Sequence, residues 1–159
     1  MINRISKLWV SGLAMLLLTP GAGALDLVDY QWHNRVLVLV AASPENPSVA
    51  AMALNRIEQS SSALTERHVV VIQLYTQANS LADGRPLTAA EAEGLRKELA
   101  VDRHDEALIL IGKDGDIKRR APLQIELAEI FAQIDAMPMR REEMRRQRST
   151  APDEFLQRY

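Results

Sequence analysis

Apolar residues fall into runs and helical spacings in the order strand, helix, strand, helix, strand, strand, helix. Three largely aliphatic runs have the composition of strands that are buried on both faces of a sheet. They are residues 36–40, 69–74 and 107–111. Between the first two runs, apolar residues recur at the spacing of one helix face, which predicts a strand–helix–strand unit with parallel strands. These positions are Val49, Ala53, Ile57 and Leu64.

Capping residues predict where the first two helices begin. Asn46 followed by Pro47 is a good start for the first helix, which we expect to run to about Leu64. Thr88 and Glu91 have the spacing of a capping box at the start of the second helix. Residues 77–87, between the second strand and this helix, are predicted to form a polar loop.

The C-terminal third of the chain contains a hairpin and two helical segments. Residues 113–116 read Lys-Asp-Gly-Asp, a tight-turn signal, and the strand 117–121 that follows carries the charges of a sheet edge. Pro122 is predicted to open the last strong helix, and Pro138 to break it and start another segment. Residues 138–148 contain five arginines and two glutamates, and residues 149–159 have the composition of a loose tail.

This order, β-α-β-α-β-β-α, predicts an α/β fold. A mixed four-stranded sheet with helices on both faces satisfies it, with an extra arginine-rich helix at the C-terminal end. The domain is predicted to occupy residues 25–148, after a leader at residues 1–24 and before the tail at residues 149–159.

Residues 1–24 have the pattern of a secretory signal peptide. Arg4 and Lys7 precede an apolar stretch at residues 8–18, and Ala22-Gly23-Ala24 fits the small-residue cleavage pattern. We therefore expect cleavage between Ala24 and Leu25 and a periplasmic or secreted protein. The alternatives are an uncleaved N-terminal anchor and a core helix.

Composition excludes several classes of function. The 159 residues include no cysteine, so disulfides, thiolate catalysis and cysteine-ligated metals are excluded. The formal charge of −2 argues against a nucleic-acid-binding protein. At 47% hydrophobic and 4% aromatic, the chain has enough apolar residues for a largely aliphatic core.

Three local motifs make the chain resemble a known protein family. They are YQWHNR at residues 30–35, LIGKDGDIK at residues 110–118 and IDAMPMRREEM at residues 134–144. The order of elements is also that of thioredoxin, and the hairpin is similar to that of peroxiredoxin-like proteins. Together with the three motifs, these features resemble the exported bacterial domain of unknown function family 4174. The family is related to thioredoxin-like modules of some secreted animal proteins. The resemblance implies a thioredoxin-like fold for residues 25–144 and no established activity.

The thioredoxin active site lies where the first strand meets its helix, here residues 42–48. Redox members need a thiolate there and a proline before the third core strand, and this chain has neither. We therefore expect no thiol oxidoreductase or peroxidase activity, and we lean toward a protein that is not an enzyme. Ser43 and Asn46 are candidate ligand contacts, and the competing interpretation is that they satisfy turn and helix-cap hydrogen bonds.

No metal or cofactor is expected. The histidines are scattered, and the acidic run at residues 102–106 occupies a predicted turn where solvated polar side chains are common. Asp114 and Asp116 resemble the start of a calcium loop whose later ligands are missing. Near the first strand, Trp32 is predicted to pack on the core and Arg35 to form a structural ion pair; the alternative for Trp32 is an aromatic that faces a ligand.

The arginine-rich segment, residues 138–148, is the feature of the sequence that most suggests a binding function. Its side chains suit an acidic partner, anionic lipid or phosphate, and the competing interpretation is a solvated helix with internal ion pairs. The candidate contacts are Arg140, Arg141, Arg145 and Arg146.

Three hypotheses follow. The leading one is a non-catalytic module that binds a protein or a small ligand. The second is a cysteine-independent enzyme that uses residues 42–48 with His33 or Arg35. The third is an envelope adaptor that acts through the arginine segment and binds a membrane only weakly.

Overall fold

The structure is a computed structural model that describes residues 25–45 and 48–150. The predicted signal peptide, its cleavage site, the candidate contact Asn46 and residues 151–159 lie outside the described residues. In chain order the elements are η1 (Leu27–Tyr30), β1 (Arg35–Ala41), α1 (Val49–Gln59), α2 (Ser61–Glu66), β2 (Val69–Tyr75), β3 (Leu81–Ala82), β4 (Arg85–Pro86), α3 (Ala89–Glu98), β5 (Ala107–Ile111), β6 (Ile117–Ala121), α4 (Leu127–Ala136) and α5 (Pro138–Thr150).

The sheet has six strands in the order β4-β3-β2-β1-β5-β6. β1 and β2 pair in parallel, and β5 runs antiparallel to β1 on its other side, so the predicted mixed sheet is confirmed. The strand count differs from the prediction because β3 and β4 lie within the expected polar loop. Each has only two residues, too few to show the two-residue periodicity by which strands are recognised.

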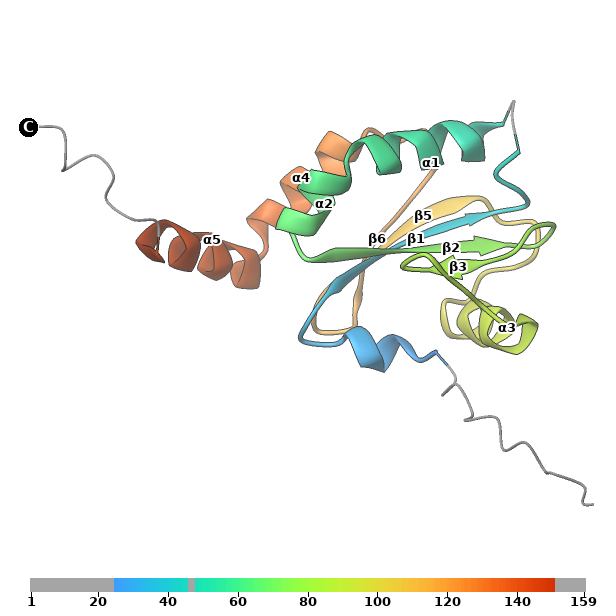
Figure 1. Cartoon of the computed structure of the whole chain (residues 1–159), viewed down its shortest axis with the longest axis horizontal. Helices are drawn as coiled ribbons and strands as arrows, with labels where there is room; N and C mark the ends of the chain where they lie inside the picture. The colour runs from blue at the N-terminus through green and yellow to red at the C-terminus, as the bar shows by residue number, and fades with distance from the viewer. Residues whose placement is uncertain (1–24, 46–47, 151–159) are drawn as a thin grey trace, which may run out of the picture.

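Helices cover both faces of the sheet, as predicted (Figure 1). One core cluster joins α1, α2 and α4 to side chains such as Leu37 and Leu39 of β1. The other joins α3 and η1 to the alternate positions Val36 and Val38. The five central residues of β1, 36–40, are at most 2% exposed, which explains why its sequence is continuously apolar.

Helix boundaries match the prediction in some places and correct it in others. The capping box of Thr88 and Glu91 is present at the start of α3, and α4 ends before Pro138, where α5 begins. The cap of α1 is Ser48, whose hydroxyl accepts from the Ala51 amide, rather than Asn46, and a break at Ser60 separates α1 from α2. Pro122 opens a turn instead of the helix, which begins at Leu127.

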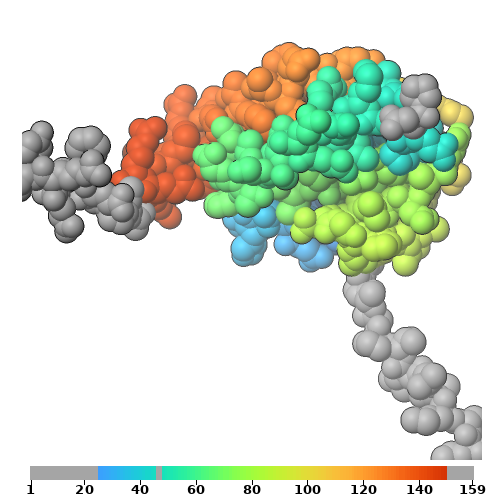
Figure 2. Space-filling model, turned by 45° about the horizontal axis from the view of Figure 1, so that its top comes forward, coloured from blue at the N-terminus to red at the C-terminus, as the bar shows by residue number. Residues whose placement is uncertain are grey.

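The hairpin between β5 and β6 forms as predicted, with Gly115 at φ +87° in its turn. α5 packs on α4 at its first turns and then extends away from the body, as Figures 1 and 2 show. In the part of the chain that the structure describes, no helix has the length and apolarity to cross a membrane.

Candidate functional site

The three motifs meet at the amino end of β1. Arg35, at the end of the first motif, is 1% exposed, and its Nη1 and Nη2 donate to Glu143 of the third motif at 3.2 and 3.3 Å. Lys113 of the second motif places its Nζ 2.8 Å from the same carboxylate. We call Arg35, Lys113 and Glu143 the motif cluster. The structural ion pair predicted for Arg35 is therefore present, and it ties the sheet to α5.

Arg140 forms a second buried network one turn earlier on α5. Its side chain is fully buried, with Nη2 2.6 Å from Glu66 Oε1 and Nε 3.3 Å from Asp135 Oδ1. Asp135 also accepts from Arg67 at 2.7 Å, and the Arg67 guanidinium lies over the Phe131 ring. Arg140, a candidate partner contact by sequence, therefore clamps α5 to α2 and α4 and is not available at the surface.

The neighbouring cations favour the charged form of Glu143, the acidic member of the motif cluster. Burial raises the pKa of Glu143, but hydrogen bonds from Lys113 and Arg35 outweigh burial and hold this pKa below its ordinary value. Burial and the charge of Lys113 lower the pKa of His68, so its ring is neutral at pH 7. His68 Nδ1 accordingly accepts from Lys113 Nζ at 2.9 Å.

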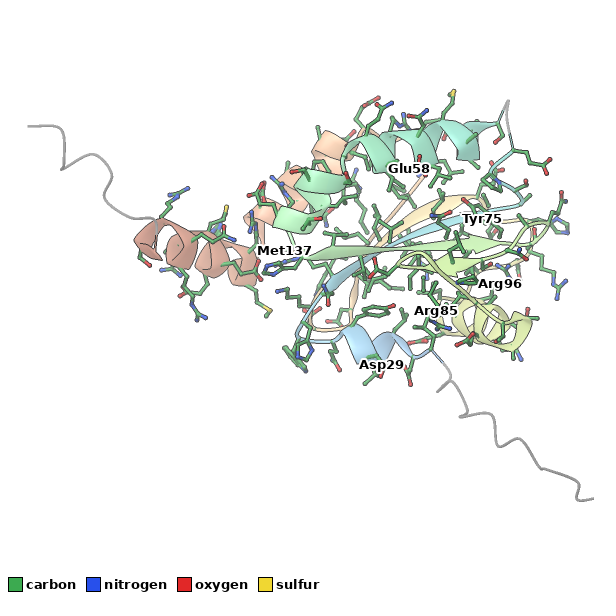
Figure 3. All side chains as sticks on the ribbon, viewed as in Figure 1. Asp29, Glu58, Tyr75, Arg85, Arg96 and Met137 are labelled. Atoms are coloured by element: carbon green, nitrogen blue, oxygen red, sulfur yellow. The ribbon has the colours of Figure 1, made fainter. Side chains whose placement is uncertain are left out.

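A cavity of about 210 Å³ opens beside the motif cluster. It is lined by Arg35, Gly112, Lys113, Asp114, Lys118, Met137, Pro138 and Met139. The methionines give it an adaptable apolar wall next to cationic side chains. Figure 3 labels Met137 at this end of the sheet, where α4 passes into α5.

Trp32 stands at the surface near this cavity. Its side chain is 62% exposed, so the prediction that it packs on the core is wrong. Its backbone is in the left-handed region, at φ 67°, and its amide donates to the Lys113 carbonyl at 2.6 Å. Bonds of the His33 and Asn34 amides to the Tyr30 carbonyl hold the same turn. The turn thus presents the indole to solvent instead of burying it.

The outer face of α5 is basic. Because Arg140 and Glu143 point inward, four arginines and one glutamate remain on the outside of the segment 138–148. Arg141, Arg145 and Arg148 line a shallow hollow with Met144. Glu142 pairs with Arg145 and, at 3.1 Å, with Arg146. Three of the four candidate arginines therefore lie outside, and the network of Arg140 holds the helix that carries them.

The loop after β1 lies at the opposite end of the sheet from these groups. Ser43 accepts a hydrogen bond from the Glu45 amide at 3.2 Å, as in the competing interpretation of a turn. β1 separates Ser43 from Arg35 by roughly 20 Å at about 3.3 Å per residue. Ser43 is therefore too far from His33 and Arg35 to act with them in one site. The structure does not bring together the groups that the enzyme hypothesis combined.

Three of the acidic groups considered as metal ligands form bonds within the chain. Asp105 accepts from the Asp102 amide at 2.7 Å, and Asp114 and Asp116 both contact Lys118 Nζ. Across residues 25–45 and 48–150, no three histidine or acidic side chains come together in a way that could hold a metal ion.

A known protein family and several known proteins are similar to this chain. The family described as Domain of unknown function (DUF4174) matches residues 26–143, which include the motif cluster. The human sushi repeat-containing protein SRPX is 26% identical over 124 residues, covering 76% of this chain and 27% of that protein. The rat SRPX protein matches with the same values. The chain thus spans about a quarter of the length of these relatives.

Solved structures with a similar fold include two Plasmodium proteins. The reduced 2-Cys peroxiredoxin of Plasmodium vivax has a TM-score of 0.54 and 17% identity, covering 76% of this chain and 72% of its own. The N-terminally modified Prx1a of Plasmodium yoelii has a TM-score of 0.52 and 13% identity, covering 74% and 80%. At these identities the likeness shows the thioredoxin-like fold alone.

Proposed function

The chain belongs to the family described as Domain of unknown function (DUF4174), and we propose that it is an exported, non-redox module that binds another protein. The binding surface consists of Trp32, Ile117 and Met139 around the hairpin, with Arg141 and Arg145 on the outer face of α5, the helix that begins beside the hairpin. We call it the hairpin surface. Its partner is a polypeptide segment that presents an apolar side chain flanked by acidic residues.

The distribution of exposed apolar side chains carries this proposal. Five large hydrophobic residues are exposed in the described part of the chain, namely Val28, Trp32, Met52, Ile117 and Met139. Trp32 bonds to the hairpin, Ile117 belongs to it and Met139 lines the cavity beside it, while Val28 lies on the neighbouring η1. Only Met52, on α1, lies elsewhere. Apolar side chains gathered in this way, and tryptophan above all, are typical of binding surfaces.

The backbone of Trp32 supports the same conclusion. A left-handed backbone conformation costs a residue with a side chain about 1–2 kcal/mol. Trp32 adopts this conformation although its indole is exposed and gains no burial in the core. Strained residues persist where the surrounding structure holds them, and they concentrate at functional positions. The bond to the Lys113 carbonyl and the bonds to the Tyr30 carbonyl supply that hold.

The charge of the surface indicates the partner's flanking residues. The outer arginines of α5 give the edge of the hairpin surface a positive potential, which favours carboxylates in an approaching segment. The networks of Arg140 and Glu143 fix α5 at its first turns, so the helix that carries Met139, Arg141 and Arg145 is held in place in advance of binding.

The remaining parts of the proposal rest on sequence and relatives. The chain has no cysteine, so the position that carries redox thiols in thioredoxins has none here. Export is supported by the pattern of residues 1–24. In the SRPX relatives the similar region makes up only about a quarter of the protein, as expected for a module that works beside other domains.

Cross-linking in cells that express the full sequence tests the proposal. Formaldehyde adducts of the wild type, Trp32→Ala, Arg141→Glu/Arg145→Glu and Met52→Ala are compared by gel and mass spectrometry. Met52 is the matched control, since it is 58% exposed but lies on α1. We expect one adduct that the Trp32 and arginine variants weaken and Met52→Ala retains. Loss of a central tryptophan contact costs about 2 kcal/mol or more, roughly thirtyfold in affinity. An adduct unchanged in Trp32→Ala, or no adduct in the wild type, contradicts the proposal.

A further inference from the structure

Arg96 differs from the other buried cations of the described chain. Arg35, Lys113 and Arg140 are each buried, and each is neutralised by at least one carboxylate within 3.3 Å. Arg96, on α3, is 7% exposed, and no carboxylate of the described residues lies within ion-pair distance of it. Buried charges in proteins are normally paired, so a buried guanidinium without a close ion pair requires an explanation.

The hydrogen bonds of Arg96 leave one nitrogen unused. Nη2 donates to the Tyr75 carbonyl, whereas Nη1 is buried and has no partner among the described residues. The Tyr75 carbonyl has a second donor, the Ser80 hydroxyl at 3.2 Å, so it does not depend on Arg96. Burial lowers the pKa of Arg96; the charge of Glu93 offsets part of this effect, and the charge of Arg103 lowers the pKa by a smaller amount. Arg96 is therefore a buried cation with one nitrogen that could donate to a ligand.

The side chain of Arg96 lines a cavity of about 250 Å³. The cavity lies at the carboxyl end of β2, beside the loop after β1, because the amides of Thr76 and Gln77 both donate to the Ala42 carbonyl. Ligands of open α/β sheets bind outside the carboxyl ends of the strands. Figure 3 shows Tyr75 and Arg96 at the end of the sheet opposite Met137, so the cavity is separate from the hairpin surface.

Other cavity groups suit a small anion. Thr76 and Asn79 line the cavity, and no hydrogen bond engages their side chains within the described part of the chain. Arg103 lies at the mouth, where its Nη2 is 3.6 Å from Glu93 Oε2. The volume is below the roughly 300–1,000 Å³ of sites for drug-sized ligands.

We propose that this cavity binds a small oxyanion, the carboxylate or phosphate group of a low-molecular-weight ligand, with Arg96 as the buried counter-charge. Thr76 and Asn79 donate to the remaining oxygens, and Arg103 attracts the anion at the mouth. Glu93 competes for the same cations, so its charge weakens binding. The proposal is independent of the hairpin surface and goes beyond protein binding.

Anion titrations of the protein purified from cells that express the full sequence test this site. Thermal unfolding is followed in sodium phosphate and in sodium acetate, each against sodium chloride at equal ionic strength. We expect the melting temperature to rise with at least one of the two anions and not with chloride. The anion that acts distinguishes a phosphate site from a carboxylate site.

Three substitutions locate the effect. Arg96→Met should weaken binding roughly tenfold to hundredfold, the range expected for loss of a charged hydrogen bond. Glu93→Gln should strengthen binding. Arg119→Met should leave it unchanged, because Arg119 pairs with Glu129 and belongs neither to the cavity nor to the hairpin surface. Circular dichroism verifies that Arg96→Met is folded.

The proposal is overturned by any of three results. These are equal melting temperatures in phosphate, acetate and chloride; an unchanged response in folded Arg96→Met; or weaker binding in Glu93→Gln. Because the hairpin surface takes no part in these titrations, their failure leaves the protein-binding proposal standing.

Discussion

Replacing Glu143 with glutamine should destabilise the protein far more than the same change at its neighbour Glu142. The substitution keeps the size of the side chain but removes the charge that pairs with Arg35 and Lys113, which are 1% and 7% exposed. Removing one partner of a buried ion pair costs about 3–5 kcal/mol. Glu143 retains 17% exposure, and an amide oxygen still accepts hydrogen bonds, so we expect a loss of about 2–3 kcal/mol.

Urea unfolding followed by far-UV circular dichroism measures this difference. Glu142→Gln is the matched control, since Glu142 is on the outside of α5, where it pairs with the exposed Arg145 and Arg146. Its loss should be at most about 0.5 kcal/mol. Equal losses for the two variants would refute the assignment of Glu143 to a buried cluster that anchors α5.

The pH dependence of the same experiment provides a second check. The folded pKa of Glu143 lies below its unfolded value, so its contribution is fully present above the unfolded pKa of about 4.3 and is lost as pH falls through the folded pKa. The stability difference between the wild type and Glu143→Gln should therefore shrink below roughly pH 4.3. A constant difference down to pH 2 would contradict this sign.

Three further outcomes are expected in urea unfolding. Trp32→Gly should leave stability unchanged or raise it by up to about 1 kcal/mol, because glycine accepts the left-handed backbone at φ 67°; a loss above about 1 kcal/mol would show that the indole supports the fold. Thr88→Ala should cost about 1 kcal/mol, while Thr88→Ser, which keeps the capping hydroxyl, should cost little. Hydrogen bonds from the Thr88 amide and Arg85 lower the pKa of Glu91 to about 2, so its contribution should be present above about pH 4.3 and disappear toward pH 2. Glu91→Gln should lack that acid-dependent loss.

The fold was largely predictable because its strongest signals are local. Strands 107–111 and 117–121 were predicted with the bounds observed, since a buried strand and a charged edge strand leave opposite patterns. Pro138 marked the end of α4, because proline cannot continue a helix. β3 and β4 were missed because β3 is held by pairing with β2 and β4 by pairing with β3, which two residues of sequence cannot reveal.

The candidate site was less predictable because burial depends on distant partners. Five arginines of α5 look alike in sequence, yet only Arg140 is buried, since Glu66 and Asp135 face it. A signal was present: Arg140 and Glu143 are three residues apart and therefore share a helix face. Which face turns inward is decided by Arg35 and Lys113, contributed from other parts of the chain.

The positions of Trp32 and Arg96 also could not be predicted from the sequence. Tryptophan is usually largely buried, and only the turn that bonds to the hairpin places Trp32 at the surface. Arg96 sits among charged residues at the end of a helix, where an exposed position is the ordinary expectation. Only the fold shows that α3 directs it toward the Tyr75 carbonyl.

Site-specific photo-cross-linking tests the central claim most directly. A photoreactive amino acid is placed singly at positions 32, 139 and 52 of the full chain, and adducts formed in intact cells are identified by mass spectrometry. The hairpin surface predicts the same partner from positions 32 and 139 and no adduct with that partner from position 52. Adducts with that partner from position 52 but from neither position 32 nor position 139, or none from any position, would contradict it.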